Sequence, residues 1–222
     1  MHRSARSLVT VLTGLSKTIL TFRGVVLPRH PAHYGLPHMD TGRLYRATGI
    51  AAMRAGVSLD DADGVAAVAR SLDLTDFDEA DLRTAEAGKA ASVVAAIPEV
   101  RQALFELQRA FATQPLGALL DGRDIGTIIA PEADAKLWVD ASVEVRGARR
   151  WKELCGQGSD LALETVIEQL RVRDQRDQSR KDAPAEMAAD AVLIDTTDLT
   201  IEAAVEKAIA AVEAAMARGN RA

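Results

Sequence analysis

The sequence predicts an α/β protein with a parallel sheet and helices on both faces of that sheet. Short, continuous apolar runs alternate with longer segments in which apolar residues recur at helical spacing. Continuous apolar runs are typical of strands buried on both faces, and parallel strands need crossover connections, which are usually helical. Of the 222 residues, 48% are hydrophobic and 27% are charged, which is an ordinary globular composition.

The expected elements follow one another along the chain. Helices are predicted over residues 59–72, 86–96, 98–111, 142–154, 161–174 and 200–218, and buried strands over residues 117–120, 136–139 and 191–194. The sequence from Ser58 to Asp61 is typical of a capping box, and Pro98 suits the first turn of a helix. Residues 73–83 are acidic and weakly patterned, which predicts a solvated turn or linker.

The charges are distributed unevenly. Residues 1–39 contain no Asp or Glu but do contain Arg3, Arg6, Lys17, Arg23 and Arg29, although the net charge of the whole chain is −5. An acid-free, basic N-terminal segment is typical of a targeting peptide, and a buried first strand with a basic flank explains it equally well. The acidic main body argues against nucleic-acid binding, and no run approaches the roughly 20 apolar residues of a membrane span.

Histidine and cysteine are too scarce for several kinds of chemistry. All four histidines lie before residue 40, and Cys155 is the single cysteine, so an internal disulfide is excluded. Histidine-based hydrolysis and His/Cys metal chemistry are disfavoured. Arginine and aspartate instead follow the expected strands, where ligands of open parallel sheets bind. Guanidinium groups at that edge suit a phosphorylated ligand, whereas simple surface ion pairs are the alternative.

Four segments, in order along the chain, resemble segments of bacterial cytidylate kinases. They are HYGLPHMDTGRLYRA at residues 33–47, AASVVAAIPEVR at 90–101, DGRDIGT at 121–127 and RVRDQRDQSR at 171–180. The resemblance covers about residues 33–215 and implies a P-loop nucleoside monophosphate kinase fold in residues 33–222. It implies a helical monophosphate-binding insert at about 43–115 and a lid at about 156–182.

The resemblance also implies an activity. The expected reaction is phosphoryl transfer from ATP to CMP or dCMP by a cytoplasmic monomer, with Mg²⁺ bridging the donor phosphates. The alternatives are a nucleotide-binding homologue with impaired catalysis and a kinase for another nucleoside monophosphate, such as AMP or UMP. Ser92, Arg101 and Asp124, which match cytosine contacts of the family, argue against that last alternative.

The residues that the resemblance implies for the acceptor nucleotide form three groups. They are Arg46, Arg123 and the hydroxyl of Thr41 at the phosphate, Ser92, Arg101 and Asp124 at the cytosine edge, and Arg173 and Asp177 at the ribose hydroxyls. Cytosine presents a carbonyl oxygen, a ring-nitrogen acceptor and an amino donor. Arginine, serine and aspartate together can satisfy all three of these groups.

The resemblance places a second set of residues near the donor nucleotide and the transferred phosphoryl group. Arg149 and Arg150 are expected at the donor, and Arg123, Arg150 and Arg180 are the expected catalytic residues. Positive charge there stabilises a loose phosphoryl-transfer transition state, so a strong base is not required. Asp121 is the expected magnesium ligand, and a structural role at the strand end is its alternative.

Residues 1–32 depart from the family pattern, which begins with a strand and a phosphate loop of the form GPxxxGKGT. Residues 8–14 could form the strand, but Lys17 and Arg23, the candidates for the donor clamp, lack the flanking glycines of such a loop. Three explanations remain open. The segment is an anomalous head read out of frame or from a misplaced start, the chain is a homologue that transfers nothing, or it is an active kinase with an unusual donor loop.

Overall fold

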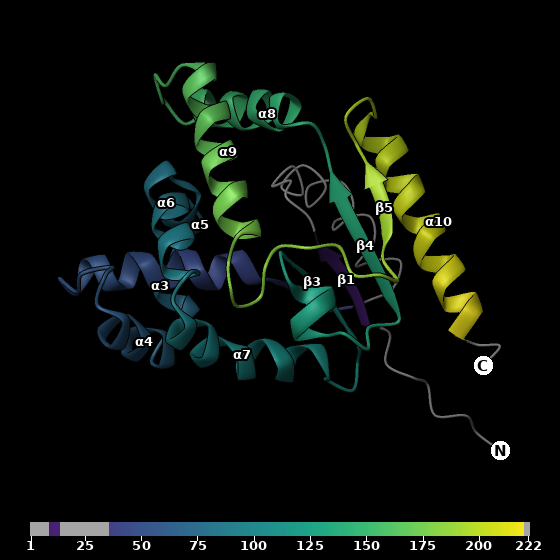
Figure 1. Cartoon of the computed structure of the whole chain (residues 1–222), viewed down its shortest axis with the longest axis horizontal. Helices are drawn as coiled ribbons and strands as arrows, with labels where there is room; N and C mark the ends of the chain where they lie inside the picture. The colour runs from purple at the N-terminus through teal and green to yellow at the C-terminus, as the bar shows by residue number, and fades with distance from the viewer. Residues whose placement is uncertain (1–8, 14–35, 220–222) are drawn as a thin grey trace.

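Within residues 9–13 and 36–219, which the computed structural model describes, five parallel strands form one sheet (Figure 1). The strands are β1 (Val9–Thr13), β2 (His38–Asp40), β3 (Ala118–Gly122), β4 (Ala135–Asp140) and β5 (Val192–Asp195). They lie in the order β2-β3-β1-β4-β5, and each pairing is parallel. The N-terminal segment therefore supplies the central strand, which pairs with β3 on one side and with β4 on the other.

Helices make up most of the remaining described residues. They are α3 (Thr41–Arg54), α4 (Ala62–Arg70), α5 (Glu79–Arg83), α6 (Ala85–Val94), α7 (Pro98–Ala112), α8 (Val143–Gly156), α9 (Leu163–Gln178) and α10 (Ile201–Gly219), with short helical turns at Leu74–Asp76 and Ile125–Ile129. Pro98 is at the first turn of α7, and the hydroxyl of Ser142 caps α8 by accepting from the backbone N–H of Val145. Both helix starts follow the sequence signals.

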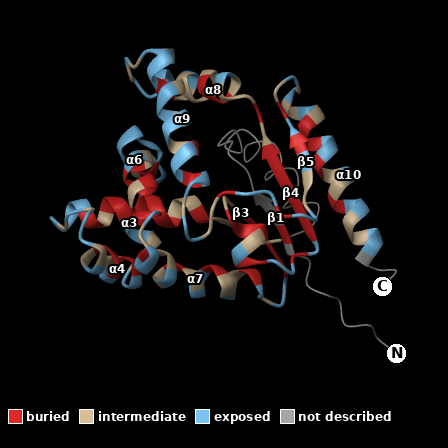
Figure 2. Cartoon of the chain, in the orientation of Figure 1, coloured by how far each residue is buried: buried red, intermediate tan, exposed pale blue. Residues whose placement is uncertain are grey.

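Helices cover both faces of the sheet. Successive residues of a strand point to opposite faces. Leu120 of β3 packs in one apolar cluster with Ala112 of α7, whereas the adjacent Leu119 packs against the cluster that Leu137 of β4 forms with α10. Figure 2 shows buried residues along the strands and on the helix faces turned toward them. The predicted α/β class is confirmed.

The segment between β2 and β3 forms a helical unit with an apolar core of its own. Leu44 of α3, Val65 of α4, Val94 of α6 and Leu104 of α7 are almost fully buried and pack in one cluster. These helices occupy the residues that were expected to form the monophosphate-binding insert. In Figure 1 they lie to one side of the sheet, with α9 above them.

Two local predictions in this segment were wrong. α4 begins at Ala62, because the carboxylate of Asp61 accepts a hydrogen bond from the backbone N–H of Gly64 and so caps the helix in place of Ser58. The expected linker at 73–83 contains a short helical turn and α5. Phe77 and Leu82 are buried there, and two apolar anchors suffice to hold an otherwise acidic segment against α3.

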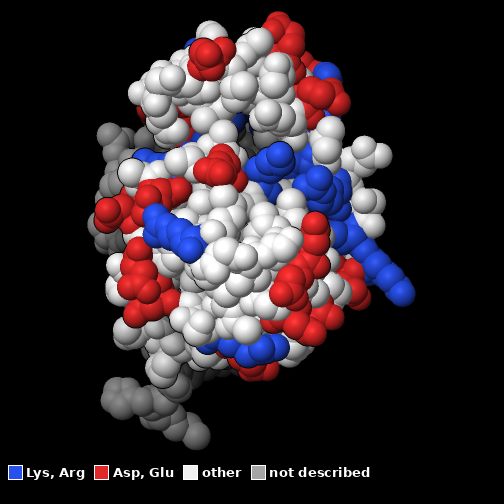
Figure 3. Space-filling model, turned by 90° about the vertical axis from the view of Figure 1, so that its left-hand side faces the viewer, with Lys and Arg blue, Asp and Glu red and all other residues white. Residues whose placement is uncertain are grey.

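Acidic and basic side chains are interspersed over the face of the molecule that Figure 3 shows. In the insert, Arg43 pairs with Glu79 at 2.7 Å and Arg54 pairs with Asp81 at 2.9 Å. Exposed pairs of this kind contribute at most about 1 kcal/mol each. Among the helices of the described ranges, none is sufficiently long and apolar to span a membrane.

We expect Gly49→Ala to lower the free energy of unfolding. A Cβ at position 49 would lie 2.7 Å from the Cβ of Ala90 and 3.2 Å from the carbonyl carbon of Ala90, so α3 and α6 would have to separate. Such overpacking costs about 1–3 kcal/mol, which exceeds the roughly 1 kcal/mol that alanine gains over glycine in a helix. Urea denaturation of the two proteins measures the difference.

The control is Gly88→Ala in the neighbouring helix α6. A Cβ at position 88 would meet nothing within 4 Å, so only the helix propensity changes and the unfolding free energy should rise by about 0.5–1 kcal/mol. Opposite signs for the two substitutions are the expected result. Two stabilising substitutions would show that α3 and α6 are not packed as closely as described.

Candidate functional site

The carboxyl ends of β2 and β3 bring two arginines together. Arg46, on α3, donates from Nη2 to the Asp40 carboxylate at 2.5 Å, and Arg123 directly follows β3. The hydroxyl of Thr41 donates to the backbone carbonyl of Asp121 at 2.9 Å and thereby fixes the start of α3 against β3. A Cβ at position 122 would lie 2.3 Å from that hydroxyl oxygen, so the close approach requires glycine.

Helix α9 places aspartates and arginines against this edge. Nη1 of Arg123 lies 3.2 Å from Asp177 Oδ2 and 3.6 Å from Asp174 Oδ1. Asp177 is only 1% exposed, and Arg173 and Arg180 of the same segment also pair with it. We define the arginine cluster as Arg46, Arg123, Arg173 and Arg180, four predicted site residues that the fold brings to one place.

The charges at this edge shift the pKa values of Asp177 and Arg173. Burial raises the pKa of Asp177, but the guanidinium groups of Arg123, Arg173 and Arg180 outweigh it and hold that pKa below its usual value. Burial and the adjacent Arg123 lower the pKa of Arg173 to about 9. Asp177 and Arg173 are therefore both charged near neutral pH.

Within the described residues, several buried polar atoms of this region have no hydrogen-bond partner. They are Nε of Arg46, Nη1 of Arg123, Nε of Arg173, Oδ1 of Asp174, Oδ2 of Asp177 and Nε of Arg180. Nη1 of Arg123, Nε of Arg173 and the two carboxylate oxygens lie in the ion pairs described above, which offset part of the cost of their burial. A buried donor with no partner, such as Nε of Arg46 or Arg180, costs about 1–3 kcal/mol. A ligand with phosphate and hydroxyl groups would supply acceptors for the guanidinium donors and donors for the carboxylates.

A second pair lies where the cytosine contacts were expected. Nη2 of Arg101, on α7, donates to the Asp124 carboxylate that follows β3, and both side chains are largely buried. The guanidinium also lies 5.9 Å from the centre of the Tyr45 ring. Burial lowers the pKa of Arg101, but Tyr45, Asp124 and Asp177 together outweigh it and raise that pKa.

Ser92, the third residue expected at the base, contacts a residue that the sequence analysis did not assign. Nη1 of Arg176, on α9, donates to the Ser92 hydroxyl at 2.8 Å, and Ser92 is 4% exposed. Arg176 follows Arg173 by three residues, so helical spacing places it near the same face. It also lies within the segment at 171–180 that resembles the family, although no role was assigned to it.

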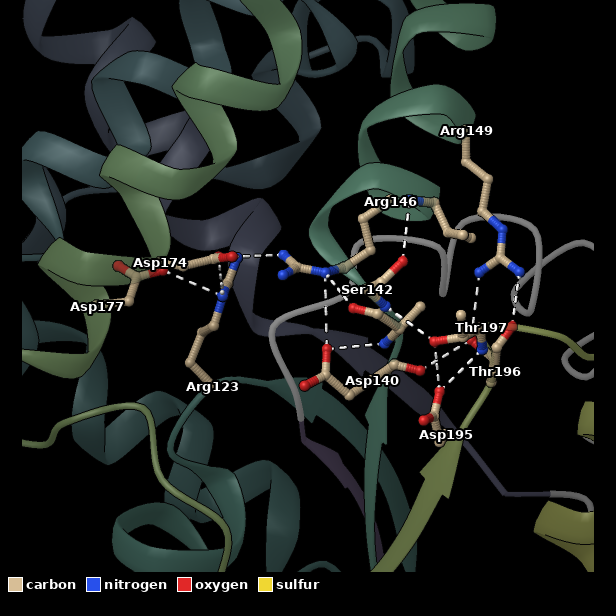
Figure 4. A network of polar contacts seen from close by, with 12 residues as sticks. Arg123, Asp140, Ser142, Arg146, Arg149, Asp174, Asp177, Asp195, Thr196 and Thr197 are labelled. Atoms are coloured by element: carbon tan, nitrogen blue, oxygen red, sulfur yellow. Dashed lines mark hydrogen bonds and ion pairs between the residues drawn. The ribbon is translucent and has the colours of Figure 1, made fainter. Parts of the chain in front are cut away.

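A chain of polar contacts joins α9 to the ends of β4 and β5 (Figure 4). Arg146 of α8 donates to Asp174 at 2.5 Å and to the backbone carbonyl of Ala141 at 2.8 Å. Beyond this point the backbone N–H of Ser142 donates to the Thr197 hydroxyl at 2.9 Å. Arg146, 7% exposed, is thus a further residue of the site that the sequence analysis missed.

The residues predicted for the donor nucleotide lie at two places on α8. Arg149 donates to the carbonyl oxygen of Thr196 at 2.8 Å and to its hydroxyl at 3.2 Å, at the end of β5 (Figure 4). Arg150 donates to Glu153 at 2.7 Å and to the carbonyl oxygen of Arg83 in the insert at 3.2 Å. Lys17 and Arg23 lie outside the described residues, as do all residues from 14 to 35.

Asp121, the predicted magnesium ligand, is the fourth residue of β3 and is 8% exposed. Its Oδ2 lies 2.7 Å from Nε2 of His38. No group of three or more His, Cys, Asp and Glu that could bind a metal ion occurs in the ranges 9–13 and 36–219. One carboxylate fits magnesium that arrives with a nucleotide, because Mg²⁺ is usually held by one or two carboxylates together with substrate phosphates.

Comparison with known proteins agrees with this geometry. The family model for cytidylate kinase matches residues 28–214. A cytidylate kinase of Methylocella silvestris is 54% identical over 193 residues, which are 87% of this chain and 89% of that protein. Cytidylate kinases of Xanthobacter autotrophicus and Caulobacter vibrioides are 55% and 52% identical over 192 and 196 residues, or 86% and 88% of this chain and 92% of each relative. The chain belongs to the cytidylate kinase family.

Proposed function

We propose that this chain transfers the terminal phosphoryl group of ATP to CMP or dCMP and releases ADP and CDP or dCDP. The observation that supports this most strongly is the arginine cluster at the carboxyl edge of β2 and β3, with its unsatisfied buried donors. Ligands of open parallel sheets bind at this edge, and guanidinium groups match phosphate oxygens in charge and geometry. Membership of the family supports kinase activity.

The proposed reaction follows from positioning and charge. Arg46 and Arg123 bind the acceptor phosphate, and Asp177 with Arg173 binds the ribose hydroxyls. Phosphoryl transfer passes through a loose transition state whose charge lies on the equatorial oxygens, so fixed guanidinium groups lower the barrier without a strong base. Arg123, Arg150 and Arg180 are the proposed catalytic residues.

Asp121 is the residue proposed to hold magnesium. Mg²⁺ bound together with ATP would offset the negative charge of the donor phosphates. Asp121 would hold it directly or through water, and the contact with His38 fixes the carboxylate that does so. Arg149 is the proposed contact to the donor nucleotide, at the end of β5.

Base selection is proposed to rest on Ser92, Arg101 and Asp124. The contact between Arg101 and Asp124 supplies both a fixed donor and a fixed acceptor beside the arginine cluster. A pair of this kind suits cytosine, whose edge presents both acceptors and a donor.

We further propose that the enzyme is a monomer and that it works in the cytoplasm, where both nucleotides are available.

One prediction of the proposed function concerns the choice of substrate. We expect CMP and dCMP to bind about ten- to a hundredfold more tightly than AMP, UMP or GMP, because a lost hydrogen bond to a charged group costs roughly 1.5–3 kcal/mol. Calorimetric titration of the protein with the five monophosphates measures this. Equal affinity for CMP and AMP would contradict the proposed assignment of the base contacts.

A second prediction separates phosphate binding from base recognition. Arg123→Ala should weaken all nucleoside monophosphates to a similar degree, because each of them carries the phosphate, whereas Asp124→Asn should mainly reduce the preference for cytosine. Arg54→Ala, which removes an exposed arginine of α3 paired with Asp81, is the control and should change neither property. A changed base preference in Arg123→Ala with intact overall affinity would show that the two roles are wrongly assigned.

A third prediction tests whether Lys17 or Arg23 binds the donor phosphates. If Lys17 or Arg23 holds the donor phosphates, its replacement by alanine should reduce CMP-dependent ADP release about a hundred- to a thousandfold, since a lost donor to developing charge costs about 3–4 kcal/mol. A coupled ADP-release assay on the wild-type protein and both variants is sufficient. Full turnover by both variants would remove these two residues from the donor site.

A further inference from the structure

Arg176 connects α9 to the part of the insert that is proposed to face the base. Its Nη1 atom donates to the hydroxyl oxygen of Ser92 at 2.8 Å, and the two residues are 84 positions apart in the sequence. Ser92 lies on α6 and is 4% exposed, whereas Arg176 lies on the exposed side of α9. The contact is therefore a specific link between two separate helices rather than part of either one.

Three hydroxyls within or at the end of other helices bond back along their own helix. Thr48 donates to the carbonyl oxygen of Leu44 at 2.9 Å, Ser71 to that of Ala67 at 3.3 Å, and Thr113 to that of Arg109 at 3.0 Å. Each bonds back by four residues, which is the common arrangement for serine and threonine on helices.

Ser92 could bond back in the same way, to the carbonyl oxygen of Gly88, which precedes it by four residues on α6. In the described part of the chain, its hydroxyl instead has Arg176 as its hydrogen-bond partner. The guanidinium group can only donate, so the hydroxyl must accept with one of its lone pairs. Its hydrogen is then turned away from the guanidinium group and is available to an acceptor elsewhere.

We propose that Arg176 is a positioning residue for base selection, which fixes the Ser92 hydroxyl in the orientation that matches cytosine. The inference rests on the proposed function, in which Ser92 contacts the base. Cytosine and uracil differ in that their donor and acceptor groups are exchanged at the ring nitrogen and at the neighbouring exocyclic position. A hydroxyl without a fixed partner can donate to cytosine or accept from uracil, whereas one that already accepts from a charged donor turns its hydrogen away from that donor and is biased to donate, as the acceptor ring nitrogen of cytosine requires.

The test compares kcat/KM for CMP and for UMP in a set of variants. Arg176→Met removes the donor and keeps most of the side-chain bulk, so the CMP-to-UMP ratio should fall about threefold to tenfold, the value of one ordinary hydrogen bond. Arg176→Lys keeps a charged donor and should restore part of the ratio. Ser92→Ala should lower the ratio, and the double variant should lower it no further, because both changes remove the same contact.

The control is Arg171→Met, the same substitution five residues earlier on α9. Arg171 is exposed and pairs with Glu144 and Glu168, so this variant should keep the wild-type ratio. Thermal unfolding of every variant reports folding, and Arg176→Gln replaces Arg176→Met if the methionine lowers the melting temperature.

Two results would overturn the inference. One is an unchanged CMP-to-UMP ratio in the folded Arg176 variants, and the other is a double variant whose loss is the product of the two single losses. Either result leaves the proposed function intact. A wild-type protein without preference for CMP over UMP would instead contradict the proposed function itself.

Discussion

The burial of Asp177 among guanidinium groups is the interaction on which the site depends. A carboxylate that is 1% exposed is strongly unfavourable unless it is paired, and the arginines around it are equally unfavourable without it. These groups come from separate elements, since Arg123 follows β3 whereas Asp177, Arg173 and Arg180 belong to α9 and the residues after it. The charges can therefore be satisfied only when α9 lies against the carboxyl edge of the sheet.

This constraint makes α9 unusual among the helices. Its buried residues are Val166, Asp174 and Asp177, so two of the three are charged. Helices of globular proteins are generally held by an apolar stripe, whose contribution does not depend on ligand charge. Ion pairs are different, because an incoming anion competes for the same guanidinium groups. The charges that hold α9 against the sheet are therefore the same charges that a bound anion would contact.

The elements could largely be predicted from local sequence, because the signals for them are local. The run at 136–139 lies within β4, and Pro98 and Ser142 define the starts of α7 and α8. Errors arose where two local signals competed. Ser58 and Asp61 can both cap a helix, and the side chain that reaches the N–H of Gly64 decided between them.

The site could be predicted only as far as the family motifs reach. Those motifs identified Arg123, Arg173 and Asp177, and the fold brings them within ion-pairing distance. Arg146 was missed because a solvated helix face explains an isolated arginine just as well, and Arg176, although it lies in the segment at 171–180, received no role. Their partners, Asp174 and Ser92, are 28 and 84 residues away, and contacts over such separations appear only when the helices are packed.

In the N-terminal segment, a β-strand and a phosphate-binding loop make different demands on the sequence. β1 occupies the centre of the sheet, where it pairs with β3 and β4 through its backbone, although the family model matches only from residue 28 onward. Backbone pairing makes modest demands on side chains, so many apolar sequences can form such a strand. A phosphate-binding loop requires glycines for close backbone approach and a lysine at a fixed position. The central position of β1 in the sheet therefore does not show whether the residues after β1 bind a donor phosphate. The roles of Lys17 and Arg23 have to be established independently of the fold.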